Sequence, residues 1–156
     1  MRRLAVPVAT LFGVGRLPVA PATWASFVVA LALVPFRGAL TPWIAAVLAA
    51  VLLPVAIAAS HEAERTLGHD AKPIVIDEVV GMLVGAIGLR PQAGPAGLVG
   101  LAALFVLFRV FDIAKPWPVG RAQDLPGGYG VVADDLLAGA YTALALWLLS
   151  GVFAAM

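Results

Sequence analysis

Five acidic residues of this chain stand in three short segments that border long apolar runs. Asp77 and Glu78 begin one apolar run, Asp112 follows another, and the pair Asp134-Asp135 precedes a third. Carboxylate oxygens are ligands that Mg²⁺ prefers, and Mg²⁺ in proteins often joins one or two carboxylates to a phosphate group. If the three segments meet, the sequence predicts a magnesium site that acts on phosphate.

Two basic residues flank the middle acid at helical spacing. Arg109 lies three residues before Asp112 and Lys115 three residues after it, so a helix through this segment places all three on one face. Their positive charges suit the oxygens of a phosphoryl group. The simpler interpretation is a ladder of ion pairs at a helix end, worth only about 0.2–0.5 kcal/mol per pair.

A glycine-rich stretch, Gly127-Gly-Tyr-Gly130, precedes Asp134 and Asp135. Glycine-rich backbone before a helix start can present N–H groups to phosphate, so we expect Gly128 and Gly130 to face the substrate. An ordinary loop followed by an acidic N-cap of the last helix has the same composition, and that alternative stays open.

Two histidines flank the polar segment that precedes Asp77. His61 and His69 are as consistent with solvated side chains as with catalysis. His69 is the better candidate because it stands just before the acidic segment. Either His69 or Glu78 could take a proton from water or orient it.

The composition indicates the environment in which these residues act. The chain has 156 residues, of which 62% are hydrophobic and 12% charged, and its mean hydropathy is +1.01. Soluble domains are nearer ~25% charged, so these values are typical of a membrane protein. A net charge of +1 suggests no surface for nucleic acid, and the lack of cysteine excludes disulfides and cysteine nucleophiles.

Five apolar segments organise the chain as a single membrane domain, 1–156. They predict an all-α, polytopic membrane helical bundle of four to five apolar helices. Segments 24–36 and 74–89 are shorter than the ~20 residues of a full span, so whether they cross is open. Gly81, Gly85 and Gly139 predict close packing between helices. Thr23 or Ser26 is expected to cap the start of the first apolar helix. The five segments are 24–36, 42–60, 74–89, 94–108 and 136–156.

Charge also predicts how the bundle is oriented. If all five segments cross, eight of the ten Lys and Arg residues and all nine acidic residues fall on one side of the membrane. Only Arg37 and Arg90 fall on the other side. The excess of Lys and Arg predicts that the charged side, and with it the active site, is cytoplasmic.

These motifs, in this order, resemble the bacterial phosphatidylglycerophosphatase A family. The resemblance runs from about Gly13 to Gly139. It rests on Pro18 to Thr23, Ser60-His61, Gly68-His-Asp70, Ile76-Asp-Glu78 with Gly81, Phe108 to Pro118, and Gly127 to Asp135. It implies an inner-membrane, multi-pass, Mg²⁺-dependent enzyme that hydrolyses phosphatidylglycerophosphate to phosphatidylglycerol and phosphate.

Residues and resemblance together predict the members of the site. The metal ligands are expected at Asp77, Asp112, Asp134 and Asp135. The catalytic set adds Glu78, Lys115 and His69, and the substrate phosphate is expected to meet Lys115, Arg109, Thr23, Gly128 and Gly130.

The chain departs from the family pattern at one place. The family usually reads A-P-G-T-x-G-S near its start, where this chain has Ala22 and Ala25 in place of both glycines. If those glycines need positive φ or close approach to phosphate, the two methyl groups would hinder it.

Three other functions stay open. Acids near membrane spans also suit a small cation-coupled transporter, although such a protein would carry them in the middle of its spans. A related lipid phosphatase for another headgroup, or a scaffold with partner-binding loops, would fit the same composition. The sequence does not predict an oligomeric state.

Overall fold

The computed structural model describes residues 2–68, 71–122 and 125–154, and all regular structure in these ranges is helical. The all-α class is therefore confirmed. In chain order the elements are α1 (Arg2–Ala9), η1 (Leu11–Arg16), α2 (Pro21–Leu33), η2 (Val34–Phe36), α3 (Pro42–Leu67), α4 (Ile76–Ala86), α5 (Gly94–Ala114), α6 (Val119–Ala122) and α7 (Gly128–Ala154).

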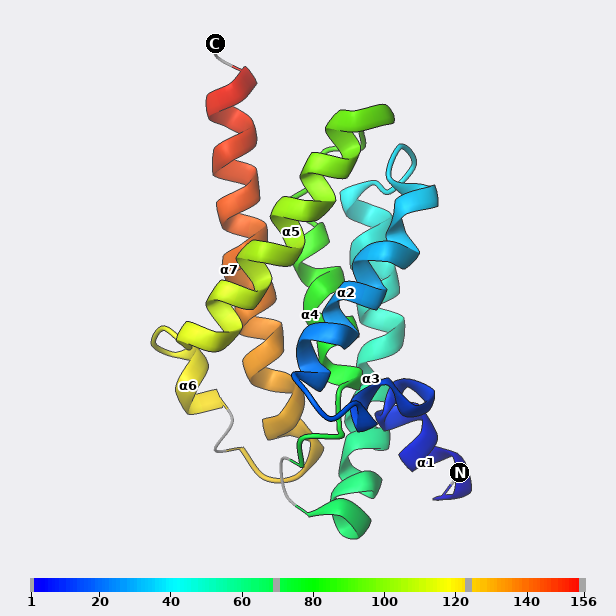
Figure 1. The fold of residues 1–156 in the computed structure, drawn as a ribbon. Helices are drawn as coiled ribbons and strands as arrows, with labels where there is room; N and C mark the ends of the chain where they lie inside the picture. Colours follow the sequence, from blue (N-terminus) through cyan, green and yellow to red (C-terminus); the bar gives the residue numbers. More distant parts are fainter. Residues whose placement is uncertain (1, 69–70, 123–124, 155–156) are drawn as a thin grey trace.

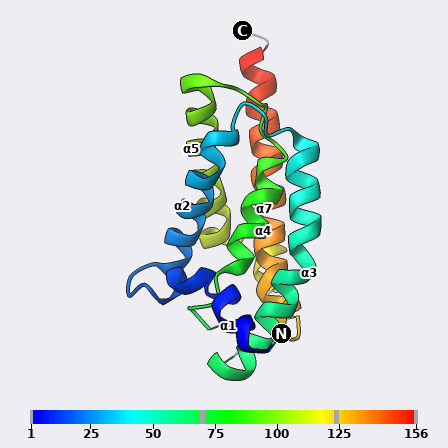
Figure 2. The same cartoon turned by 90° about the vertical axis from the view of Figure 1, so that its right-hand side faces the viewer.

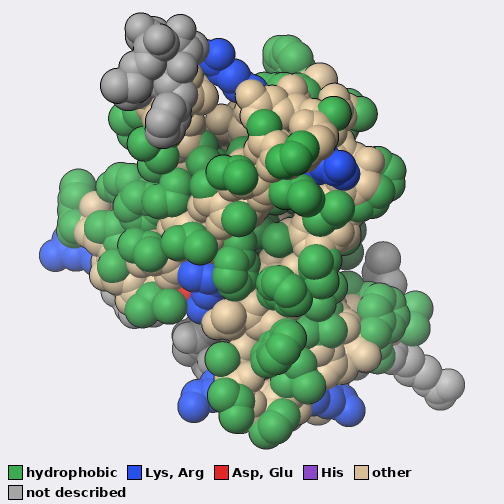
Figure 3. All heavy atoms as spheres, turned by 45° about the horizontal axis from the view of Figure 1, so that its top comes forward, with side chains coloured by type: hydrophobic (Ala, Val, Ile, Leu, Met, Phe, Trp, Pro, Cys, Tyr) green, Lys and Arg blue, Asp and Glu red, His purple; other side chains and the backbone are tan. Residues whose placement is uncertain are grey.

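Three of these helices are long and apolar enough to cross a membrane: α3, α5 and residues Gly128–Ser150 of α7. Residues Pro21–Phe36 form a shorter apolar helix. Each of the five apolar segments thus contains a helix within the described residues, which supports the predicted membrane bundle. Whether α2 and α4 also cross, and so the count of four to five spans, stays a prediction. Hydrophobic side chains cover most of the face in Figure 3.

The short helix α4 lies at the centre of the bundle, where it packs against α7, α3, α2 and α5 (Figures 1 and 2). Its 11 residues extend only about 16 Å. Glycines allow the close approach: a Cβ at Gly81 would lie 2.8 Å from the Asp135 carbonyl oxygen, and one at Gly139 would lie 2.4 Å from the Gly81 carbonyl oxygen. The predicted close packing at Gly81, Gly85 and Gly139 is confirmed.

The charged segments of the sequence lie at one end of the bundle. Figure 1 shows α1, α6, the start of α4 and the start of α7 together at its lower end. The connections 37–41 and 87–93 lie at the opposite end, as does the end of α7. The helices therefore bring the three acidic segments to one end, as the alternation of loops predicts.

The start of α2 differs from the prediction. Ala20, with φ 48°, occupies the N-cap position, and Pro21 is the first helical residue. Neither Thr23 nor Ser26 caps the helix, because both lie inside it; the prediction of a cap at these positions is wrong. Ala22 and Ala25 are also helical, and neither needs the left-handed region. Alanine therefore fits both positions without backbone strain.

The start of α7 also differs from the prediction. The helix begins at Gly128, six residues before Asp134, so the acidic pair is not its N-cap. The expected glycine-rich loop is wrong for Gly128 to Gly130, which are helical. Gly128 has a packing reason instead, since a Cβ there would lie 2.2 Å from the Ile57 carbonyl oxygen of α3.

Candidate active site

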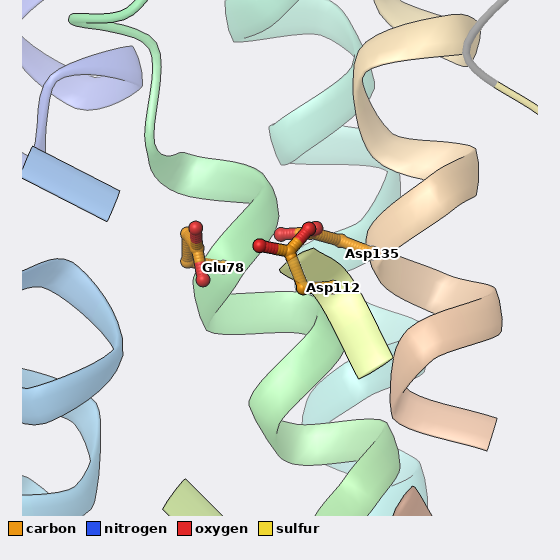
Figure 4. Close-up of side chains that lie close together, drawn as sticks. All are labelled: Glu78, Asp112 and Asp135. Atoms are coloured by element: carbon orange, nitrogen blue, oxygen red, sulfur yellow. The ribbon is translucent and has the colours of Figure 1, made fainter. Parts of the chain in front are cut away.

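Three carboxylates from three helices meet near the charged end of the bundle. Glu78 comes from the first turn of α4, Asp112 from the last turn of α5, and Asp135 from the second turn of α7. One oxygen of each lies within 4.8 Å of the others (Figure 4). We call Glu78, Asp112 and Asp135 the acidic cluster.

Local sequence explains why α5 reaches the acidic cluster and then ends. A continuous apolar run carries the helix to Ala114, so the predicted face with Arg109 and Asp112 exists. Lys115 then adopts a left-handed conformation, with φ 42°, and Pro116 follows. Because the residue before a proline disfavours helical geometry, the chain leaves the helix directly after Asp112 and its neighbours.

Arg109 joins two members of the cluster. Its Nη1 donates to both carboxylate oxygens of Glu78, at 2.7 and 2.9 Å, and lies 3.0 Å from Asp112 Oδ2. Ser26 of α2 adds a hydroxyl, which lies 2.6 Å from Glu78 Oε2 and 2.9 Å from the Ala22 carbonyl oxygen. These buried hydrogen bonds fix the position of Glu78.

The charges of the cluster are not balanced. Arg109 supplies one positive charge against three carboxylates that are buried or nearly so. Asp135 Oδ2 is buried and has no hydrogen-bond partner among the residues that the structure describes. An ionised oxygen buried in this way is costly unless a cation or donor satisfies it. The oxygen-only donor set fits a hard divalent cation such as Mg²⁺.

Asp77 and Asp134 lie next to the cluster in sequence but have other bonds. Asp77 Oδ1 accepts the backbone N–H of Glu78 at 3.0 Å. Asp134 Oδ1 accepts the backbone N–H of Asp135 at 3.1 Å, and its Oδ2 lies 2.7 Å from Lys115 Nζ. Of the four predicted metal ligands, the structure thus brings Asp112 and Asp135 together with Glu78.

The remaining predicted residues are placed as follows. Lys115 is about one-third exposed, and its Nζ lies 2.7 Å from Asp134 Oδ2. Thr23 is half-buried and lines a groove with Arg109. His69 lies outside the described residues.

Sequence reasoning did not find Ser26 as a site residue. A polar side chain one turn into an apolar run was the available signal, but the same pattern suits a helix cap. Only the packing of α2 beside α4 shows that this hydroxyl meets Glu78.

Comparison with known proteins identifies the family of the chain. The family model for phosphatidylglycerophosphatase A matches residues 7–150, and no solved structure matches. A Bacteroides thetaiotaomicron protein named "Putative phosphatidylinositol-3-phosphatase" is 33% identical over 156 residues, covering 94% of this chain and 96% of that protein.

Two relatives carry the family's own name. Phosphatidylglycerophosphatase A of Escherichia coli is 33% identical over 143 residues, covering 88% of this chain and 78% of that protein. Its counterpart in Haemophilus influenzae is 29% identical over 138 residues, covering 87% and 82%. The chain therefore belongs to the phosphatidylglycerophosphatase A family of lipid phosphatases.

Proposed function

We propose that this protein hydrolyses phosphatidylglycerophosphate to phosphatidylglycerol and phosphate in a Mg²⁺-dependent reaction. The observation that carries the proposal is the acidic cluster, in which three carboxylates lie together and one guanidinium binds two of them, at the end of a membrane bundle. Family membership supports the reaction class, and it favours a phosphatase over the transporter and scaffold alternatives.

The acidic cluster is where the metal would bind. Asp112 and Asp135 are the first candidates for its ligands, with Glu78 beside them and Asp77 and Asp134 near enough in sequence to add oxygens. When bound, Mg²⁺ would polarise the phosphate and make a water molecule a better nucleophile. The unpartnered oxygen of Asp135 supports this assignment.

Basic residues would hold the phosphate beside that metal site. Lys115 is the more accessible of the two cations. Its flexible side chain would let the ammonium turn from Asp134 to a phosphoryl oxygen while it stays at the charged end of the bundle. Arg109 is more buried and is held by Glu78 and Asp112, so it stabilises charge from a fixed position. Both charges act where negative charge develops on the phosphoryl oxygens.

Glu78 has a positioning role in this proposal. Both of its oxygens accept hydrogen bonds from Arg109, and one also faces the Ser26 hydroxyl. A carboxylate engaged in this way orients its neighbours better than it removes a proton from water. His69 therefore stays the candidate for a proton acceptor that the sequence proposes.

The charged end is proposed to face the cytoplasm from the inner membrane. Eight of the ten Lys and Arg residues belong to segments on that side if the apolar segments alternate. Only the headgroup phosphate would then need to leave the bilayer, while the acyl chains stay in it.

Phosphate release from purified protein in detergent micelles tests the proposal. The substrates are phosphatidylglycerophosphate, phosphatidylinositol 3-phosphate and phosphatidic acid, each with Mg²⁺ or with EDTA. We expect phosphatidylglycerophosphate to be hydrolysed fastest, EDTA to abolish the activity, and Asp135→Asn to lower it at least ~100-fold. Glu62→Gln, which removes a carboxylate from an exposed ion pair, is the matched control.

Two results would contradict the proposal. Preference for phosphatidylinositol 3-phosphate would retain the phosphatase and move the substrate to the one that the Bacteroides relative is named for. Undiminished activity after EDTA treatment and dialysis would overturn the metal dependence.

A further inference from the structure

An open groove runs along the outer face of α5, and Thr23 of α2 completes its lining. Its volume is about 490 Å³, which is in the range of sites that hold small ligands. It is lined by Thr23, Phe105, Val106, Arg109, Val110 and Ile113.

The groove is apolar except at two side chains. Val106, Val110 and Ile113 are exposed on a helix that is long enough to cross the membrane, so this wall faces acyl chains. From Phe105 to Ile113 the helix rises about 12 Å, which gives the groove the length of a substantial part of a lipid chain.

An aromatic contact holds the two helices together at the groove. Phe105 of α5 meets Phe27 of α2 edge to face, with ring centroids 5.9 Å apart. Phe27 in turn meets Trp24 at 6.0 Å in the same geometry. Because Phe105 also lines the groove, its packing against α2 fixes the position of this part of the lining.

Arg109 connects the groove to the acidic cluster. Its side chain lines the groove, while its Nη1 reaches Glu78 and Asp112. Its Nε is buried and has no hydrogen-bond acceptor in the part of the chain that the structure describes. Thr23 of α2 also lines the groove and is its other polar side chain. A positive charge and a hydroxyl thus stand beside an apolar channel.

This combination matches a phosphomonoester attached to an acyl chain. We propose that the groove between α2 and α5 binds one acyl chain of the phospholipid substrate and directs its phosphate past Arg109 to the acidic cluster. The inference rests on the proposed function, because it assigns the substrate's apolar part to a place beside that site. It makes the groove a determinant of selectivity for lipid phosphates over water-soluble ones.

Filling the groove tests this inference. Val110→Trp and Val106→Trp each add bulk to its wall, and Leu98→Trp adds bulk at an exposed position of α5 outside the groove. Hydrolysis is measured on phosphatidylglycerophosphate with long chains and on its deacylated, water-soluble counterpart. Each valine variant should raise KM for both compounds by different factors. We expect the factor for the long-chain lipid to be at least ten times the factor for the deacylated compound. Leu98→Trp should leave both values unchanged.

A binding measurement separates this inference from the reaction itself. Phosphatidylglycerophosphate with a diazirine in one acyl chain is irradiated with Asp135→Asn protein, and the labelled residues are mapped. We expect labels between Phe105 and Ala114 that unlabelled phosphatidylglycerophosphate displaces and phosphatidylcholine does not. Val110→Trp should remove them, while Leu98→Trp should retain them.

The outcomes distinguish the two proposals. Equal displacement by phosphatidylcholine, or equal KM changes for both substrates, would show that the groove holds only bulk lipid and would overturn the inference. If another phospholipid monoester proves to be the substrate, the same probes built on that lipid test the groove unchanged. In that case the proposed headgroup would be wrong, and the inference about the groove would still stand or fall by its own test.

Discussion

Two ion pairs of this chain share one geometry and differ in their surroundings. Glu62 and Arg65 lie three residues apart on α3, as Arg109 and Asp112 do on α5, and both pairs have a distance of 3.0 Å. The side chains of Arg65 and Glu62 are 56% and 27% exposed, whereas those of Arg109 and Asp112 are 12% and 14% exposed. The α5 pair also contacts Glu78, which comes from another helix.

The comparison shows that spacing and distance do not identify a functional pair. An exposed pair at this spacing contributes a few tenths of a kcal/mol, because water screens it and its side chains lose entropy. The buried pair has excess negative charge around it, because Glu78 binds the same guanidinium and Asp135 adds a third carboxylate nearby. An arrangement that leaves buried charge uncompensated is poor for stability and suits a site that binds a cation.

The largest effect is expected from Asp112→Asn. The change retains the shape of the side chain but removes a charge from the cluster, so phosphate release should fall at least ~100-fold. The thermal midpoint should stay the same or rise, because one of three like charges is gone. Activity assays and thermal unfolding of the purified protein provide both values.

A loss of folded protein in proportion to the loss of activity would contradict this prediction. It would mean that the Arg109–Asp112 pair is structural, like an ordinary ladder of charges at a helix end. Full activity in Asp112→Asn would remove the residue from the site altogether.

A smaller effect is expected at the ion pair of Lys115 with Asp134, which lies beside the acidic cluster. Lys115→Met removes the accessible cation, and we expect phosphate release to fall by about 10- to 100-fold. The variant also leaves Asp134 without its 2.7 Å partner. In the double variant Lys115→Met with Asp134→Asn, stability should return while activity stays low. Restored activity in the double variant would show that Lys115 serves only to neutralise Asp134.

The fold could be predicted from sequence as far as hydropathy determines it. In the residues that the structure describes, each of the five apolar segments contains a helix, because a segment in lipid must satisfy its backbone internally. Glycines at helical spacing also indicated where helices approach, as at Gly81 and Gly139. The start of α7 was not predictable in the same way. Glycines disfavour helix locally, and contact with α3 overrides that preference at Gly128.

The acidic cluster shows how far the site could be predicted from the sequence. Residue type and the direction of the helices were enough to bring acidic segments to one end. Which of two adjacent acids meets the carboxylates of the other helices depends on the rotation of each helix, and a sequence does not state that rotation. Glu78 rather than Asp77, and Asp135 rather than Asp134, therefore emerged as cluster members only from packing around α4.

A moderate effect is expected at Ser26, whose hydroxyl supports Glu78. Ser26→Ala removes a 2.6 Å hydrogen bond to a buried carboxylate, which costs about 1.5–3 kcal/mol for a charged partner. We expect the free energy of unfolding to fall by that amount, and kcat to fall several-fold with KM nearly unchanged. Because Ser26 acts through Glu78, the double variant with Glu78→Gln should show no further loss of kcat. Additive losses would mean that Ser26 acts on the substrate directly.

The smallest effect is expected from Glu62→Gln, which breaks the exposed ion pair of Glu62 with Arg65. The free energy of unfolding should change by less than about 0.5 kcal/mol, and phosphate release should equal that of the parent protein. Raising the salt concentration should leave this variant and the parent equally stable, since exposed pairs are screened. If Glu62→Gln instead lowered activity as Asp112→Asn does, charge anywhere at this end of the bundle would serve the reaction. The distinction between the two pairs would then lose its basis, because burial and the third carboxylate would no longer decide which pair is functional.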